Sequence, residues 1–193
     1  MSINLLETVQ KNLGFPTLKK IDPNTQEVKR DEKTAAEDKF SQAAIPAVLT
    51  ALYRYVQSDE GATAFLSGDH SSSWVGRIFD NHSHEAVQTI SEYAKECNLD
   101  PVAKINAIAN ETVKVVKENL AAGTGIKEVK DFFSNQRNNI LLYLPPALNM
   151  GKLLDDDTLD DNTNKMEGPV SSLIKSIGNA FSNPVTGEEI KKQ

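Results

Sequence analysis

Apolar residues recur every three or four positions along much of the chain, which is the spacing of one face of an α-helix. The pattern is clearest in two successive segments, residues 83–97 and 102–120, joined by a tight turn at residues 98–101. The first segment carries its apolar face at Ala86, Val87, Ile90, Tyr93, Ala94 and Cys97, and the second at Val102, Ile105, Ala109, Thr112, Val113, Val116 and Leu120. A short link places two such helices side by side and antiparallel, so we expect this helical hairpin to organise the chain.

Residues at the ends of the hairpin favour helix initiation. Ser83 is expected to cap the first helix by accepting a hydrogen bond from a free amide of the first turn. Glu85 then places a negative charge near the positive end of the helix dipole. Asp100 and Pro101 are expected to start the second helix, because Asp caps well and proline at the first helical position loses no needed hydrogen bond.

The same periodicity predicts helices on both sides of the hairpin. Residues 3–13 form a short amphipathic helix, and residues 43–56 form an apolar stripe in which Pro46 either begins the helix or kinks it. The chain is expected to break at Asp59-Glu60-Gly61, followed by short helical pieces at residues 62–66 and 74–79 and a long helix from residue 126 to about residue 144. We therefore predict an all-α fold, a compact bundle of antiparallel helical hairpins with N- and C-terminal amphipathic helices.

Shifts in composition divide the chain into four predicted parts. Residues 1–40 are an N-terminal helix and a polar linker, residues 41–154 the helical core domain, residues 155–168 an acidic linker, and residues 169–193 a C-terminal amphipathic helix and tail. The apolar stripe of the last part consists of Val170, Leu173, Ile174, Ile177 and Phe181. A helix with so few apolar residues needs a surface to cover, and we expect that surface to be the protein's own helices or a second copy.

Charge argues against nucleic acid as a partner and disfavours a membrane. The 21 Lys and Arg residues against 27 Asp and Glu residues leave a net charge of −6, which repels polyanions and anionic lipids over most of the surface. The hairpin also has the outline of a helix-turn-helix, but its second helix offers Lys104, Lys114 and Lys117 without an arginine, so DNA binding is disfavoured.

The sequence favours a cytoplasmic location. Cys97 is the sole cysteine, so no internal disulfide can form, and a reducing compartment fits. The first residues lack the apolar run and small-residue cleavage site of a signal peptide, and nowhere do the ~18 consecutive apolar residues of a membrane span occur.

One group of residues has metal-binding potential. All three histidines lie between residues 70 and 84, close to several carboxylates. The candidate ligands of a divalent metal are Asp69, His70, Asp80, His82 and His84, with Glu85 beside them. The alternative is that these are exposed polar residues at the start of a helix, because no H-E-x-x-H or cysteine-pair spacing accompanies them.

Enzyme motifs are missing from the sequence. It contains no G-x-G-x-x-G, no phosphate-binding Walker loop and no G-x-S-x-G elbow, and the helical pattern offers no strand to carry them. We therefore assign no catalytic residue, and enzymatic activity is left open but not favoured.

Part of the chain resembles a known family. The residues that carry the resemblance are Ala44-Ile45-Pro46-Ala47-Val48-Leu49, Gly61-Ala62 and Val75-Gly76-Arg77-Ile78-Phe79, followed by a helix, the Asn98-Leu99 turn and a second helix. Over residues 43–120 this arrangement is similar to the YidB-type family of bacterial proteins. The resemblance implies an all-α domain of unknown function, without a catalytic residue to carry over.

Two functions from different classes follow as hypotheses. The first is a bacterial helical domain for protein interaction or scaffolding, whose partner is another protein or a second copy of the chain. The second is a metal-binding protein with a His/Asp site of unknown reaction.

Overall fold

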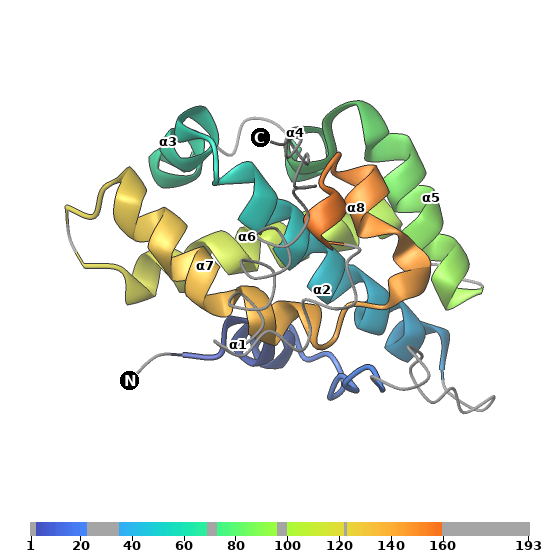
Figure 1. Cartoon of the computed structure of the whole chain (residues 1–193). Coiled ribbons are helices and arrows are strands. Elements are labelled where there is room, and N and C mark those ends of the chain that lie inside the picture. The colour runs from blue at the N-terminus through green and yellow to red at the C-terminus, as the bar shows by residue number, and fades with distance from the viewer. Residues whose placement is uncertain (1–2, 23–34, 69–72, 96–99, 122, 160–193) are drawn as a thin grey trace, which may run out of the picture. The chain divides into compact units, whose positions relative to one another are not determined.

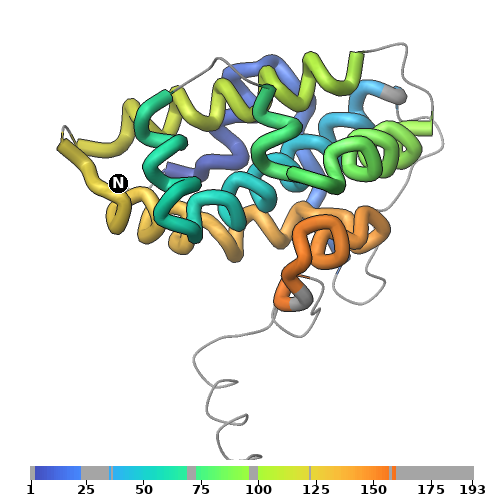
Figure 2. Tube along the Cα trace, turned by 90° about the horizontal axis from the view of Figure 1, so that it is seen from above, coloured from blue at the N-terminus to red at the C-terminus, as the bar shows by residue number. Residues whose placement is uncertain are grey.

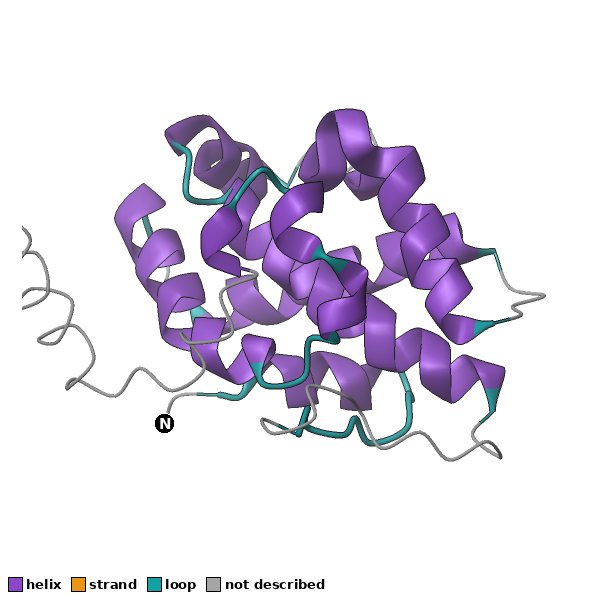
Figure 3. Ribbon diagram, turned by 45° about the vertical axis from the view of Figure 1, so that its right-hand side comes forward, coloured by secondary structure: helices purple, strands orange, loops and turns teal. Residues whose placement is uncertain are grey.

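The computed structural model describes residues 3–22, 35–68, 73–95, 100–121 and 123–159. Its elements are α1 (Leu5–Asn12), α2 (Ala36–Tyr55), α3 (Asp59–Ser67), α4 (Trp74–Phe79), the 3-10 helix η1 (Asp80–His82), α5 (Ser83–Ala94), α6 (Pro101–Asn119), α7 (Ile126–Leu141), η2 (Pro146–Leu148), α8 (Met150–Leu153) and η3 (Asp157–Leu159). The described residues contain no strand, as Figure 3 shows, and the predicted all-α bundle is confirmed.

Helix α2 is the centre of the bundle. It contacts α1, α4, α5, α6 and α7 (Figure 1). The middle of α2 is fully buried on every side, which is typical of a helix that is apolar all round. Helices α5 and α6 contact each other, yet each makes more contact with α2 than with the other. The expectation that the hairpin organises the chain is therefore corrected, because its two helices need the apolar surface of α2 to cover their inner faces.

Pro46 lies inside α2, because the helix starts at Ala36. Of the two predicted alternatives, the one in which Pro46 begins the helix is therefore wrong. The Pro46 carbonyl oxygen accepts a hydrogen bond of 2.7 Å from the Thr50 hydroxyl within the buried part of the helix.

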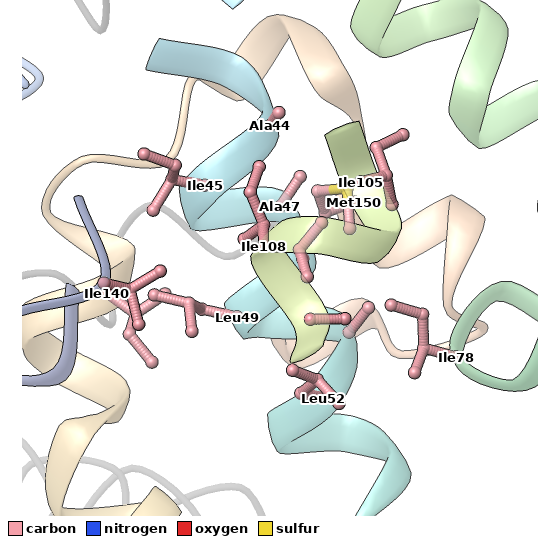
Figure 4. Packing of buried hydrophobic residues seen from close by; sticks show 14 of the residues in the cluster. Ala44, Ile45, Ala47, Leu49, Leu52, Ile78, Ile105, Ile108, Ile140 and Met150 are labelled. Carbon is pink, nitrogen blue, oxygen red and sulfur yellow. The ribbon is translucent and has the colours of Figure 1, made fainter. Parts of the chain in front are cut away.

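The core forms where α2 meets α4, α6, α7 and α8. Figure 4 shows buried side chains that these helices contribute to the core: Leu49 and Leu52, Ile78, Ile105 and Ile108, Ile140, and Met150. Ile105, Thr112 and Val116 of the predicted inner face of α6 are buried. Val102 was expected on the same face but is 41% exposed. The first turn of α6 extends past the helices that cover the rest of α6, so its residues are partly or fully exposed to solvent.

Helix ends follow the predicted chemistry only in part. Asp100 caps α6 as expected, with its carboxylate accepting from the Ala103 amide at 3.1 Å, and Glu85 lies in the first turn of α5. Ser83 does not cap α5, because η1 precedes it and the backbone is already helical at Ser83, with φ −56° and ψ −40°. The cap of α4 comes from another helix, since the Asn106 side-chain oxygen accepts from the Trp74 amide at 2.8 Å.

The expected break at Asp59-Glu60-Gly61 is instead the first turn of α3. Ser58 caps this turn, since its hydroxyl oxygen accepts from the Gly61 amide at 2.9 Å. The turn follows α2 closely, so only a residue without a side chain fits at position 61: a Cβ there would overlap the Tyr55 carbonyl oxygen.

The N-terminal segment docks on the core through buried glutamines. Helix α1 packs on α6, α2 and α7 (Figure 2). Its Leu5, Leu6 and Val9 are buried. Gln136 of α7 accepts from the Leu5 amide at 3.0 Å and donates to the Ile3 carbonyl at 2.9 Å. Gln42 of α2 holds Lys19 in the same way, accepting from its amide at 2.8 Å and donating to its carbonyl at 3.0 Å. The described residues of the predicted N-terminal part, residues 1–40, therefore belong to the structural unit of the core.

Among the described residues, that unit extends to residue 159. The predicted C-terminal helix and most of the predicted acidic linker lie outside the described residues. The described start of the linker forms η3, whose Leu159 is buried. Within the described ranges, none of the helices combines the length and the apolar character that crossing a bilayer requires.

Candidate functional site

The predicted metal ligands that the structure describes lie on two adjoining helices. Asp80 and His82 lie in η1, while His84 and Glu85 lie in the first turn of α5. Asp69 and His70 lie outside the described residues. Asp80 turns the chain from α4 into α5 with φ 43° and ψ −123°, a conformation that costs a residue with a side chain about 1–3 kcal/mol.

The described part of the chain holds no group of three His, Cys, Asp or Glu side chains with the arrangement of a metal site. It places Asp80 and His82 at the same cleft, whereas His84 is exposed on α5. The full set of five candidate ligands includes Asp69 and His70, so a divalent metal at this place stays a prediction.

The double variant His82→Gln/His84→Gln checks this prediction. Both imidazoles are partly or fully exposed, and such substitutions change stability by about 0.5 kcal/mol at most, so we expect a melting temperature within about 2 °C of the wild type. Circular dichroism gives the melting temperature, and elemental analysis of protein purified without a histidine tag gives the metal content. A stoichiometric metal in the wild type that the double variant lacks would establish the metal site.

The cleft that contains Asp80 and His82 has a volume of about 260 Å³. It forms where the end of α2, the α4–η1 junction and the end of α8 meet; Figure 1 shows α8 near α4 and α5. We call it the polar cleft, and its lining residues are Arg54, Tyr55, Ser58, Ile78, Phe79, Asp80, Asn81, His82, Leu153, Leu154 and Asp155. Ile78, Phe79, Leu153 and Leu154 are buried and supply an apolar floor.

His82 lies between two carboxylates from different elements. Its Nδ1 is 3.4 Å from Glu85 Oε2, and its Nε2 is 3.8 Å from Asp155 Oδ2. Asp155 follows α8 and has φ 50°, so it is, like Asp80, a residue with a side chain in a rare backbone conformation. The composition around Asp155 predicts an acidic linker, and nothing in the spacing of Asp155 and His82 indicates that the two residues lie side by side.

Glu85 is tied to α8 by a lysine. Lys152 Nζ donates to Glu85 Oε1 at 3.2 Å. This hydrogen bond, followed by the one with His82 and the positive charge of Lys152, holds the pKa of the exposed Glu85 carboxyl below its ordinary value. The link joins α5 to α8 at the edge of the polar cleft.

We expect Lys152→Met to raise the pKa of Glu85 towards its ordinary value. A carboxyl whose pKa is lowered by folding stabilises the folded state above the pKa of the unfolded chain, and this contribution disappears as the pH falls through the folded pKa. The variant should therefore lose a small stabilisation at neutral pH and none in acid. An NMR titration of the Glu85 carboxyl measures the pKa, with Lys127→Met on the exposed side of α7 as the control. An unchanged Glu85 pKa in Lys152→Met would show that the lysine is not responsible.

Some charged side chains at the polar cleft have a partner of opposite charge and others do not. Arg54 Nε lies 3.7 Å from Asp156 Oδ2, and Glu85 is paired with Lys152. Asp80 makes no ion pair or hydrogen bond with another described side chain, and Asp155 faces only His82, which carries a charge only when protonated. Two carboxylates at the rim are thus without a lysine or arginine from the described chain.

The hydroxyl of Ser58 is occupied by structural hydrogen bonds. It donates to the Tyr55 carbonyl at 3.2 Å and accepts from the Gly61 amide at 2.9 Å, so it caps α3. A hydroxyl held in this way is not activated as a nucleophile, which needs a neighbouring base that takes its proton. The Ser58 hydroxyl is therefore a structural cap of α3 and not a candidate nucleophile.

Comparison of the chain with protein-family models, with curated proteins and with solved structures finds no match. The resemblance to the YidB-type family accordingly stays a prediction, and a function for the polar cleft must be argued from its own geometry.

Proposed function

We propose that the chain is a helical protein-interaction domain of the bacterial cytoplasm and that it contacts its partner, another protein or a second copy, through the polar cleft. The observation that carries the proposal is the pair of carboxylates, Asp80 and Asp155, at the rim of an apolar floor without a basic partner from the described chain. Charged groups at an interface give specificity and speed association when the partner supplies the complementary charge.

The rest of the described surface supports recognition through polar groups. Val102 is its one large hydrophobic side chain with high exposure, and it lies in the first turn of α6. Protein interfaces that do not use a broad apolar patch depend on charged and polar contacts around a small apolar centre. The polar cleft combines these two components.

Backbone strain at both carboxylates also supports a binding role. Asp80 and Asp155 adopt positive φ values of 43° and 50°. Conformations of this kind persist where the surrounding structure holds them, and they are concentrated at binding and active sites. The segments that precede the two residues, α4 and the end of α8, are anchored in the core by Ile78, Phe79, Leu153 and Leu154.

Site-specific photo-cross-linking in living cells of the source organism tests the proposal. A benzoylphenylalanine is placed at Asn81, an exposed residue of the polar cleft, and in a matched variant at Asn139, an exposed residue of α7. We expect a discrete covalent adduct from position 81 and none from position 139. The adduct should disappear in the background of Asp80→Asn/Asp155→Asn.

The mass of the adduct identifies the kind of partner. Twice the chain mass of 21.2 kDa indicates a second copy, and any other discrete mass indicates a different protein, which peptide sequencing then identifies. Absence of an adduct at position 81, or an equal adduct at position 139, would contradict an interaction through the polar cleft. The metal-binding alternative is decided separately by the elemental analysis described above.

A further inference from the structure

We propose that the polar cleft binds a lysine or arginine side chain of the partner, with the cationic head between Asp80 and Asp155 and the aliphatic stem on the apolar floor. The inference rests on the proposed function and adds to it the chemistry of the partner. It follows from the charge balance, the lining and the size of the cleft.

The charge balance favours a cation. Arg54 is compensated by Asp156 at 3.7 Å, and Glu85 by Lys152 at 3.2 Å. Asp80 and Asp155 remain, and the neighbouring His82 is neutral unless protonated. A positive group brought to the rim therefore meets two carboxylates whose charges no described lysine or arginine offsets, whereas a carboxylate or phosphate is repelled by them.

The floor of the cleft suits a long aliphatic stem. Ile78 and Phe79 come from α4, and Leu153 and Leu154 from the end of α8. Lysine and arginine lay their methylene groups on apolar surface while the charged head stays at a polar rim. The order of groups in the cleft, apolar below and carboxylate above, matches the order of groups along such a side chain.

The cleft has room for one long side chain. It measures about 260 Å³, near the lower end of the roughly 300–1,000 Å³ that is usual for pockets of drug-sized ligands or cofactors. Because it opens at an exposed rim, a residue that projects from a larger partner can enter it.

Blocked pentapeptides provide the probe. The peptide Ac-Ala-Ala-Lys-Ala-Ala-NH2 and its arginine, norleucine and glutamate analogues are titrated into the full-length ¹⁵N-labelled protein at low salt. We expect the lysine and arginine peptides to shift the amide signals of residues 54–58, 78–82 and 153–155. The norleucine peptide, which keeps the stem and lacks the charge, should bind at least about fivefold more weakly, and the glutamate peptide should leave these signals unchanged.

Charge-neutralising variants assign the effect to the two carboxylates. Asp80→Asn and Asp155→Asn should each weaken binding of the lysine peptide about threefold to fivefold, because each removes one partly exposed ion pair. Asparagine has nearly the same shape as aspartate, so both variants should retain the fold, which the rest of the NMR spectrum verifies. Asp131→Asn, an exposed carboxylate of α7, is the matched control and should leave binding unchanged.

Three outcomes would overturn the inference: tighter binding of the glutamate peptide, equal binding of all four peptides, or shifts that map outside the polar cleft. Cross-linking keeps this result separate from the proposed function. An adduct from position 81 without lysine binding leaves the interaction in place and refutes the cationic side chain. Lysine binding without an adduct shows that the cleft accepts a cationic side chain and refutes the proposed interaction in the cell.

Discussion

Ile105→Asp is expected to prevent the protein from folding. Ile105 is fully buried on α6, in the cluster formed with α2, α4 and α8. A carboxylate there has no partner, and leaving a charge uncompensated in the core costs about 3–5 kcal/mol. That cost is a large part of a total stability of about 5–15 kcal/mol. Circular dichroism and thermal melting should show a lost or strongly lowered transition.

Val102→Asp is the matched control for this result. It introduces the same side chain one turn earlier on the same helix, but at a position that is 41% exposed. A carboxylate in the first turn of a helix also meets the positive end of the dipole, so we expect a change within about 0.5 kcal/mol. Equal melting temperatures for the two variants would show that the inner face of α6 is wrongly assigned.

Gly61→Ala should destabilise the junction between α2 and α3. The added Cβ would overlap the Tyr55 carbonyl oxygen and approach the Ser58 hydroxyl oxygen to 2.8 Å. The first neighbour is backbone, so no change of rotamer relieves the overlap, and one of the two helices has to move. Overpacking of this kind costs about 1–3 kcal/mol, and occasionally more, measurable as a shift of the urea unfolding midpoint. The strain also reaches Tyr55 and Ser58, which line the polar cleft.

Gly76→Ala is the matched control, because the same substitution there adds a Cβ that meets no neighbouring atom. Gly76 is an exposed residue within α4, and a Cβ there meets no atom within 4 Å. Because alanine is a better helix former than glycine, we expect a gain of about 0.5–1 kcal/mol. Destabilisation by both substitutions to a similar degree would mean that close approach to Tyr55 is not the reason for glycine at position 61.

The candidate site was predictable only where its residues are neighbours in the sequence. Asp80, His82 and Glu85 lie within two turns of helix, so the sequence itself shows a histidine close to two carboxylates. Arg54 and Asp155 belong to the same cleft but come from the end of α2 and the end of α8. Their proximity results from the packing of those helices, and the composition around Asp155 predicted a linker instead.

The sequence by itself determined the helices and most of their buried faces. Periodicity at 3.6 residues per turn is a local property, and it placed α1, α5, α6 and α7, with inner residues such as Ile90 and Ile105. The cap at Asp100 is equally local, because its acceptor and donor lie within one turn. Such features depend on neighbouring residues and can be read without knowing the fold.

Only the tertiary structure decided which helix is central and what surrounds it. The apolar stripe of α2 did not distinguish a central helix from a peripheral one, because that depends on how many other helices bury their faces against it. The amide contacts of Gln42 and Gln136 and the cap of α4 by Asn106 join residues far apart in the chain. A polar side chain can satisfy a distant backbone group only after packing has brought the two within hydrogen-bond distance, so neither spacing nor composition indicates the pair.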